Sequence, residues 1–206
     1  WPRFLNILRE IYKDWAAPGK VLTMDSVDLI VNGSCAEYCI DSYFETKQKY
    51  DTSTGRYVPK TKEEQAAEFG GTQLIRHMAA EFDRFLVAVK FLQNKGVTVY
   101  TTWHSSVFAV KSPFEDQDYN KISIDLKATK ENNLREMLIN AVSMLLYADV
   151  NTQYIKATKR VEGGDKPYLY TSPSAAYDTT KARGIQLPDE IPFVYAEFKK
   201  ALLSTK

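Results

Sequence analysis

Two short apolar runs on either side of a long amphipathic segment constrain the fold of this chain more than any other feature. The first run, 21–24, is followed directly by Asp25, and the second, 97–103, is followed by His104. Between them, 74–92 carries apolar residues at helical spacing. A strand, a helix and a second strand in this order form a βαβ unit with parallel strands and a right-handed crossover. The chain is therefore predicted to be an α/β protein.

The residues that follow the two strands are the first candidates for a functional site. Parallel strands end at the same edge of a sheet, where open α/β proteins bind ligands. Asp25, with Ser26 beside it, is a candidate ligand for a magnesium–phosphate group, because Mg²⁺ prefers carboxylate oxygens. His104 is expected at the same edge. Two alternatives stay open, since Asp25 and Ser26 also suit a helix N-cap, and His104 also suits a hydrogen-bonded imidazole at a strand end.

Around this unit the pattern predicts further helices, strands and loops. Helices are expected over 3–15, 131–140 and 192–203, and strands over 141–159 and 168–171. Two segments rich in polar and turn-forming residues, 45–71 and 105–122, are predicted to be loops, and the first is a long exposed one.

Composition and length describe an ordinary globular chain. The 206 residues are 44% apolar and 26% charged, which suits one domain and contains no membrane-spanning run. A net charge of +1 means that any nucleic-acid surface must be local. Cys35 and Cys39 are too few for a disulfide scaffold, and zinc would need two more ligands, so reduced core cysteines in a cytoplasmic protein are favoured. Because the first residue is Trp1, we expect the chain to be the remainder of a longer product.

Three segments in order resemble the RecA-like P-loop ATPases, particularly the phage-encoded nucleotide-binding proteins linked to recombination. Leu22-Thr23-Met24-Asp25-Ser26-Val27 is similar to the Walker B strand of that family. Val99-Tyr100-Thr101-Thr102-Trp103-His104 is similar to its sensor strand, which ends in a polar residue. Lys181-Ala182-Arg183-Gly184 is similar to its Lys-x-Arg segment. The resemblance covers about residues 1–195.

The resemblance implies a single RecA-like domain over 1–206, with a mainly parallel twisted sheet flanked by helices and antiparallel strands near the C-terminus. It also implies a homo-oligomer, a ring or a filament, that hydrolyses ATP at its subunit interfaces. Asp25 would hold Mg²⁺ through water and His104 would sense the γ-phosphate. Lys181 and Arg183 would act on nucleotide bound to the neighbouring subunit; the alternative for these two is a solvated, salt-bridging turn.

One element of the family is not in these 206 residues. The phosphate-binding loop, G-x-x-x-x-G-K-[ST], does not occur in the sequence. The family order places it upstream of Trp1, together with the carboxylate that activates water, so no general base is assigned. Either the chain is part of an ATPase, or it is a non-catalytic scaffold or interaction protein with a degenerate RecA-like fold.

The segment 45–71 is the first candidate for contact with single-stranded DNA, because RecA-like proteins bind DNA through a loop at this place. It combines cations with aromatic rings, as single-strand binding requires. These candidates are Lys47, Lys49, Tyr50, Arg56, Tyr57, Lys60 and Lys62. The alternative is a polar loop with incidental charge. The segment 105–122 is a weaker candidate because it also carries acids.

Overall fold

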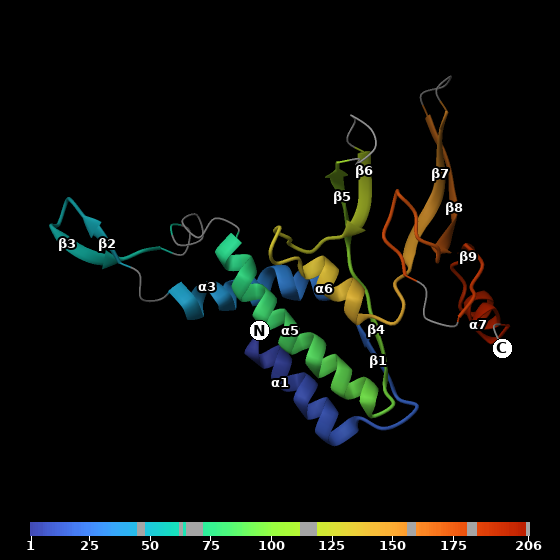
Figure 1. The fold of residues 1–206 in the computed structure, drawn as a ribbon, viewed down its shortest axis with the longest axis horizontal. Helices are drawn as coiled ribbons and strands as arrows, with labels where there is room; N and C mark the ends of the chain where they lie inside the picture. The colour runs from blue at the N-terminus through green and yellow to red at the C-terminus, as the bar shows by residue number, and fades with distance from the viewer. Residues whose placement is uncertain are drawn as a thin grey trace. The chain divides into compact units, whose positions relative to one another are not determined.

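The computed structural model describes residues 1–44, 48–61, 64, 72–111, 119–155, 160–180 and 185–204 (Figure 1). The chain forms two compact units. The first unit contains 1–104 and 125–140, and the second contains 105–124 and 141–206.

Helices account for most of the core of the first unit. Helix α1 (Pro2–Glu10) continues into a π-helical turn, η1 (Ile11–Trp15), and runs beside the long α5 (Thr72–Asn94) (Figure 1). The predicted helical spacing is confirmed in α5, whose buried residues include Leu74, Met78, Phe82 and Phe85. The other helices among the described residues of this unit are α2 (Val27–Leu29), η2 (Ile30–Cys35), α3 (Ala36–Phe44) and α6 (Leu134–Ala141).

Strands β1 (Val21–Met24) and β4 (Thr98–Thr101) pair in parallel, as the βαβ prediction requires. The turn from α5 into β4 needs Gly96, whose φ is +80° and where an added Cβ would lie 2.9 Å from the Cα of Pro18. The sheet has only these two strands within the described ranges. A mixed α/β fold is therefore present, whereas the larger parallel sheet of the RecA-like prediction is not shown.

A β-hairpin lies where the sequence predicted a long loop. Strands β2 (Gln48–Asp51) and β3 (Arg56–Pro59) pair antiparallel. Asp51 closes the turn, because its carboxylate accepts hydrogen bonds from the Ser53 backbone and hydroxyl and from the Thr54 hydroxyl. Turn chemistry of this kind lets a polar sequence form short strands.

The second unit is built from antiparallel strands. The predicted loop 105–122 is largely a hairpin of β5 (Ser105–Val110) and β6 (Tyr119–Ile124). Strands β7 (Tyr147–Ile155), β8 (Arg160–Tyr170) and β9 (Glu190–Pro192) form an antiparallel sheet, which confirms the prediction of antiparallel strands near the C-terminus. Helix α7 (Tyr195–Leu203) packs through Phe198 and Leu202 on a core of Leu169, Leu187 and Ile191.

This separate core explains why the C-terminal part forms its own unit. No helix in the described ranges is both long enough and apolar enough to cross a membrane.

Candidate functional site at the carboxyl edge of β1 and β4

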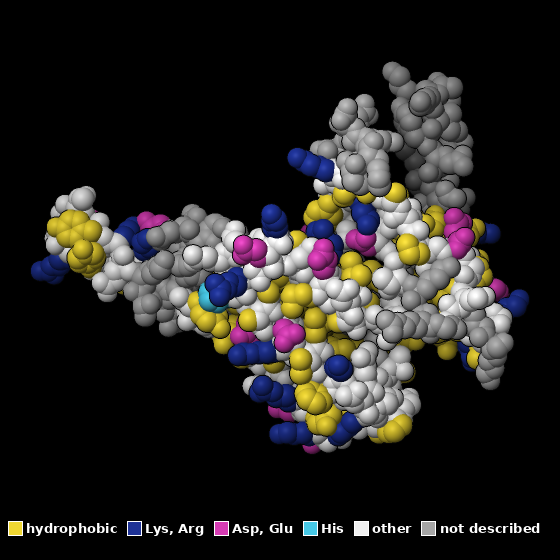
Figure 2. Space-filling model, in the orientation of Figure 1, with side chains coloured by type: hydrophobic (Ala, Val, Ile, Leu, Met, Phe, Trp, Pro, Cys, Tyr) yellow, Lys and Arg dark blue, Asp and Glu magenta, His cyan; other side chains and the backbone are white. Residues whose placement is uncertain are grey.

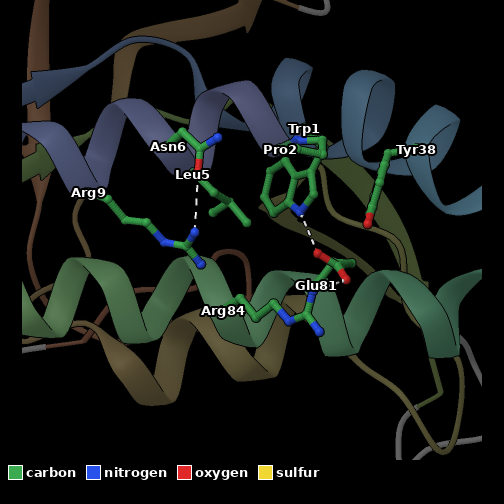
Figure 3. A pocket seen from close by; sticks show the side chains of 8 residues that line it. All are labelled: Trp1, Pro2, Leu5, Asn6, Arg9, Tyr38, Glu81 and Arg84. Atoms are coloured by element: carbon green, nitrogen blue, oxygen red, sulfur yellow. Dashed lines mark hydrogen bonds and ion pairs between the residues drawn. The ribbon is translucent and has the colours of Figure 1, made fainter. Parts of the chain in front are cut away.

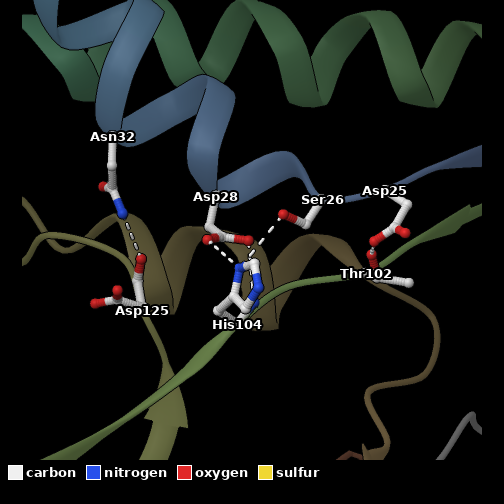
Figure 4. A network of polar contacts seen from close by, with 7 residues as sticks. All are labelled: Asp25, Ser26, Asp28, Asn32, Thr102, His104 and Asp125. Atoms are coloured by element: carbon white, nitrogen blue, oxygen red, sulfur yellow. Dashed lines mark hydrogen bonds and ion pairs between the residues drawn. The ribbon is translucent and has the colours of Figure 1, made fainter.

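The structure places Asp25 and His104 at the same edge of one sheet, where Asp25 follows β1 directly and His104 follows β4 after Thr102 and Trp103 (Figure 4). Backbone hydrogen bonds continue past the paired strands: Thr102 N–H donates to the Met24 carbonyl at 3.0 Å, and Val27 N–H donates to the Thr102 carbonyl at 3.0 Å. The Thr102 hydroxyl donates to the Asp25 carboxylate. The peptide bond between Asp25 and Ser26 is cis. The segments after the two strands are thus held together in a fixed register.

Asp28 is the organising residue of this edge, and the sequence analysis did not single it out. Its side chain is only 2% exposed. One carboxylate oxygen, Oδ1, accepts the backbone N–H of His104 at 3.0 Å, and the other, Oδ2, lies 2.9 Å from His104 Nδ1. Asp28 sits in the first turn of α2, where the unpaired backbone N–H groups favour a negative charge. The carboxylate therefore fixes both the backbone and the ring of His104.

The pairing shifts the pKa values of both groups. Burial alone raises the pKa of the Asp28 carboxyl, but the hydrogen bonds from the His104 backbone and ring outweigh burial, so this pKa is lowered. The hydrogen bond and the charge of Asp28 raise the pKa of the His104 imidazole. The pair thus favours a carboxylate and an imidazolium, and the positive charge lies at the carboxyl edge of β1 and β4.

The geometry around the ring argues against a nucleophilic serine. Ser26 Oγ lies 3.3 Å from His104 Nδ1, the same nitrogen that contacts Asp28. In a Ser-His-Asp triad the serine and the acid contact opposite ring nitrogens. Here Nε2 has no hydrogen-bond partner among the described residues, and the His104 side chain is 62% exposed. The ring is therefore oriented to offer Nε2–H to an external acceptor.

Asn32 and Asp125 support the position of His104 from the other side. Asn32 Nδ2 donates to the Asp125 carbonyl at 2.7 Å, and Asp125 N–H donates to the His104 carbonyl at 2.9 Å (Figure 4). The amide oxygen of Asn32, Oδ1, is buried without a hydrogen-bond partner in the described part of the chain. These bonds hold the chain after β4 against η2.

A magnesium ligand at Asp25 is compatible with this arrangement. Mg²⁺ in nucleotide sites is held by one or two carboxylates, water and the phosphates of the substrate. Asp25 supplies one exposed carboxylate, although its Oδ1 is engaged by Thr102. Among the described residues, no three side chains of the metal-binding types are grouped for a metal ion. Asp25 fits a Mg²⁺ site that the phosphates of a substrate complete.

The structure describes some of the remaining predicted site residues and not others. Lys181 and Arg183 lie outside the described residues, as do Lys47 and Lys62. Of the predicted nucleic-acid contacts, the hairpin carries Lys49, Tyr50, Arg56 and Tyr57, and Lys60 follows it.

The hairpin presents aromatic rings more than charge. Tyr50 and Tyr57 are cross-strand partners whose ring centroids lie 5.3 Å apart, and they are 56% and 69% exposed. Lys49 forms an ion pair with Glu64, so its charge is partly compensated. Hydrogen bonds from Ser53 and Thr54 lower the pKa of Asp51 to about 2, which keeps a negative charge at the turn. Arg56, paired in register with Asp51, is the exposed cation of the hairpin.

Sequence reasoning missed Asp28, Thr102 and Asn32 because the partner of each lies more than 70 residues away. Asp28 has one usable signal, an acid between the apolar Val27 and Leu29 just after the strand. The same signal is typical of any first-turn acid on a helix.

Comparisons with known proteins found no match: no family model, curated protein or solved structure matches this chain.

Proposed function

We propose that this chain is the nucleotide-responsive part of a DNA-associated RecA-like ATPase. The observation that carries the proposal is the common edge of β1 and β4, where Asp25 and a carboxylate-anchored His104 lie together. Under this proposal the two strands belong to a larger, mainly parallel sheet. The resemblance of the Walker B, sensor and Lys-x-Arg segments is the second support.

Each residue at the edge has a defined task in the proposal. Asp25 accepts a hydrogen bond from water bound to Mg²⁺, which neutralises phosphate charge during phosphoryl transfer. His104 donates Nε2–H to an oxygen of the γ-phosphate, and its raised pKa favours the cationic form of that donor. Asp28 keeps Nδ1 protonated and holds the ring plane. When the γ-phosphate leaves, His104 loses its hydrogen-bond acceptor. The segment that follows His104 can then change its conformation.

The proposal requires a phosphate-binding loop, which these 206 residues do not contain. A cradle of backbone N–H groups at a helix N-terminus must come from a segment outside them or from another subunit. The protein to be assayed therefore contains this chain together with that loop.

Asp25→Asn is the direct test. We expect ATP turnover to fall about 10²-fold or more, the range for losing one group that stabilises transition-state charge. Turnover is measured by phosphate release at saturating Mg²⁺, with and without single-stranded DNA. Asp83→Asn, which neutralises an exposed acid on α5, is the matched control and should leave turnover unchanged. Equal turnover in the Asp25 variant and wild type would reject the magnesium role, and no turnover in wild type would favour the scaffold.

Contact with single-stranded DNA is the second part of the proposal, and the hairpin supports it. Exposed Tyr50 and Tyr57 offer faces on which bases stack, each worth about 1–3 kcal/mol, and Arg56 offers a phosphate contact. Lys49 is already paired with Glu64. Stacking of bases on the tyrosines should therefore contribute more to the affinity for single-stranded DNA than the number of cations in the hairpin suggests.

Salt titrations separate these contributions. Tyr50→Ala and Tyr57→Ala should each weaken binding of single-stranded DNA about 5- to 150-fold without changing the slope of log K against log salt. Arg56→Gln should reduce that slope by about 0.7, the value for one phosphate contact on a single strand. Lys49→Gln is the matched control and should change the slope less. If all four variants bind like wild type, the hairpin is not a contact surface.

A further inference from the structure

A small cavity in the first unit, away from the residues of the β1–β4 edge, gathers hydrogen-bond donors. Its volume is about 170 Å³, and residues of α1, α3 and α5 line it (Figure 3). This is below the 300–1,000 Å³ typical of sites for drug-sized ligands, so it suits a group of a few atoms.

A buried carboxylate forms the base of the cavity. Glu81 on α5 is 1% exposed, and its two oxygens accept hydrogen bonds from the Trp1 indole Nε1–H at 2.9 Å and from Arg84 at 2.7 Å. A buried charge is tolerated only when it is paired in this way. Trp1 and Arg84 thus compensate the charge of the Glu81 carboxylate. The same carboxylate holds the guanidinium of Arg84 at the cavity.

The remaining polar groups at the cavity are mostly donors. Arg84 uses only one of its amino groups on Glu81, and its side chain is 62% exposed. Arg9 contacts Asn6 through one amino group at 3.3 Å. The Tyr38 hydroxyl, which points toward Glu81 in Figure 3, has no hydrogen-bond partner among the described residues. Two guanidinium groups against one carboxylate leave a net positive charge.

We propose that this cavity binds a small oxyanion, a carboxylate or a phosphate group, between Arg9 and Arg84. Guanidinium groups bind both kinds of oxyanion through paired N–H donors, and a phenol hydroxyl adds a third donor. Glu81 is a positioning residue for Arg84, and Trp1 forms the aromatic wall. The inference is independent of the proposed ATPase activity, because none of these residues belongs to the edge of β1 and β4.

The indole N–H of Trp1 provides a direct readout, because it is part of the cavity. The chain has three tryptophans, so a ¹⁵N-resolved spectrum has three indole signals, and those of Trp15 and Trp103 serve as internal controls. Inorganic phosphate and acetate are titrated separately at constant ionic strength. We expect a saturable shift of the Trp1 signal. Saturation by phosphate alone assigns the site to phosphate groups, whereas saturation by acetate as well assigns it to carboxylates.

Arg9→Gln tests the assignment with little risk to the fold, since Arg9 donates its hydrogen bond to the exposed Asn6. The affinity for the anion should fall about ten- to a hundredfold, as expected for one charge-assisted contact. Arg3→Gln removes the same charge from the same helix outside the cavity lining and should leave the affinity unchanged. No saturable shift with either anion, or equal affinity in the Arg9 variant and wild type, would overturn the proposal.

Discussion

An Arg183→Ala variant is expected to turn over ATP about 10³- to 10⁵-fold more slowly than wild type while binding nucleotide with similar affinity. This is the range for an arginine that reaches a neighbouring subunit's phosphates, and it corresponds to roughly 4–7 kcal/mol of barrier. The planar guanidinium binds two phosphate oxygens at once, whereas Lys181 supplies a point charge. Lys181→Ala should therefore have a smaller effect. Phosphate release and nucleotide binding are measured separately.

Mixing two inactive variants tests whether Arg183 acts across the interface. Arg183→Ala keeps the Asp25 edge intact, and Asp25→Asn keeps the arginine intact. In a mixed oligomer some interfaces combine one intact edge with one intact arginine, so part of the turnover should return. A mixture that stays inactive although the subunits exchange would exclude action in trans, and an Arg183 variant with normal turnover would place the residue in an ordinary solvated turn.

The local pattern of this chain predicts its central βαβ unit well. The spacing of Met78, Phe82 and Phe85 depends only on one helix burying one face, and all three are buried. The parallel pairing of β1 with β4 follows from the helix between them, because a crossover helix commonly joins two parallel strands. Phe91 of the same helix is 53% exposed, and its ring contacts that of Tyr12. The next residue, Leu92, is fully buried, so the exposure of Phe91 reflects its face of α5 and not the end of the core contact.

The two hairpins and the organisation of the site depend on contacts that sequence patterns do not record. The turn at Asp51 forms because the Asp51 carboxylate accepts hydrogen bonds from backbone and hydroxyl groups two and three residues away. A polar composition alone does not indicate these bonds. His104 was identified from its place after a strand, since that place is defined locally. Asp28 was not identified, because its role depends on its contact with His104, 76 positions away along the chain. Polar contacts between residues far apart in the sequence are identified only from the three-dimensional structure.

Asp28→Asn is expected to slow ATP turnover about 10- to 100-fold, the usual effect of removing a carboxylate that orients a histidine. An asparagine keeps the size of the side chain but removes the charge, so the pKa of His104 should return toward its ordinary value of 6.5. Titration of the His104 ring signals by NMR measures this shift, and His77 provides the second histidine of the chain as an internal control. A structural role alone would not change the pKa of His104.

The same variant changes how folding stability depends on pH. A lowered Asp28 pKa stabilises the fold above its ordinary value of 3.8, and this contribution is lost as the pH falls through the lowered value. A raised His104 pKa stabilises the fold below 6.5, and that contribution is lost as the pH rises through the raised value.

The pair therefore contributes most between about pH 4 and 6.5, and Asp28→Asn should lower the free energy of unfolding more inside this window than at higher pH. Urea unfolding at pH 5 and pH 8 measures it. A variant that lowers stability by the same amount at both values would mean that Asp28 acts by packing alone. His104 would then sit at the edge of β1 and β4 without the charge that a phosphate sensor requires.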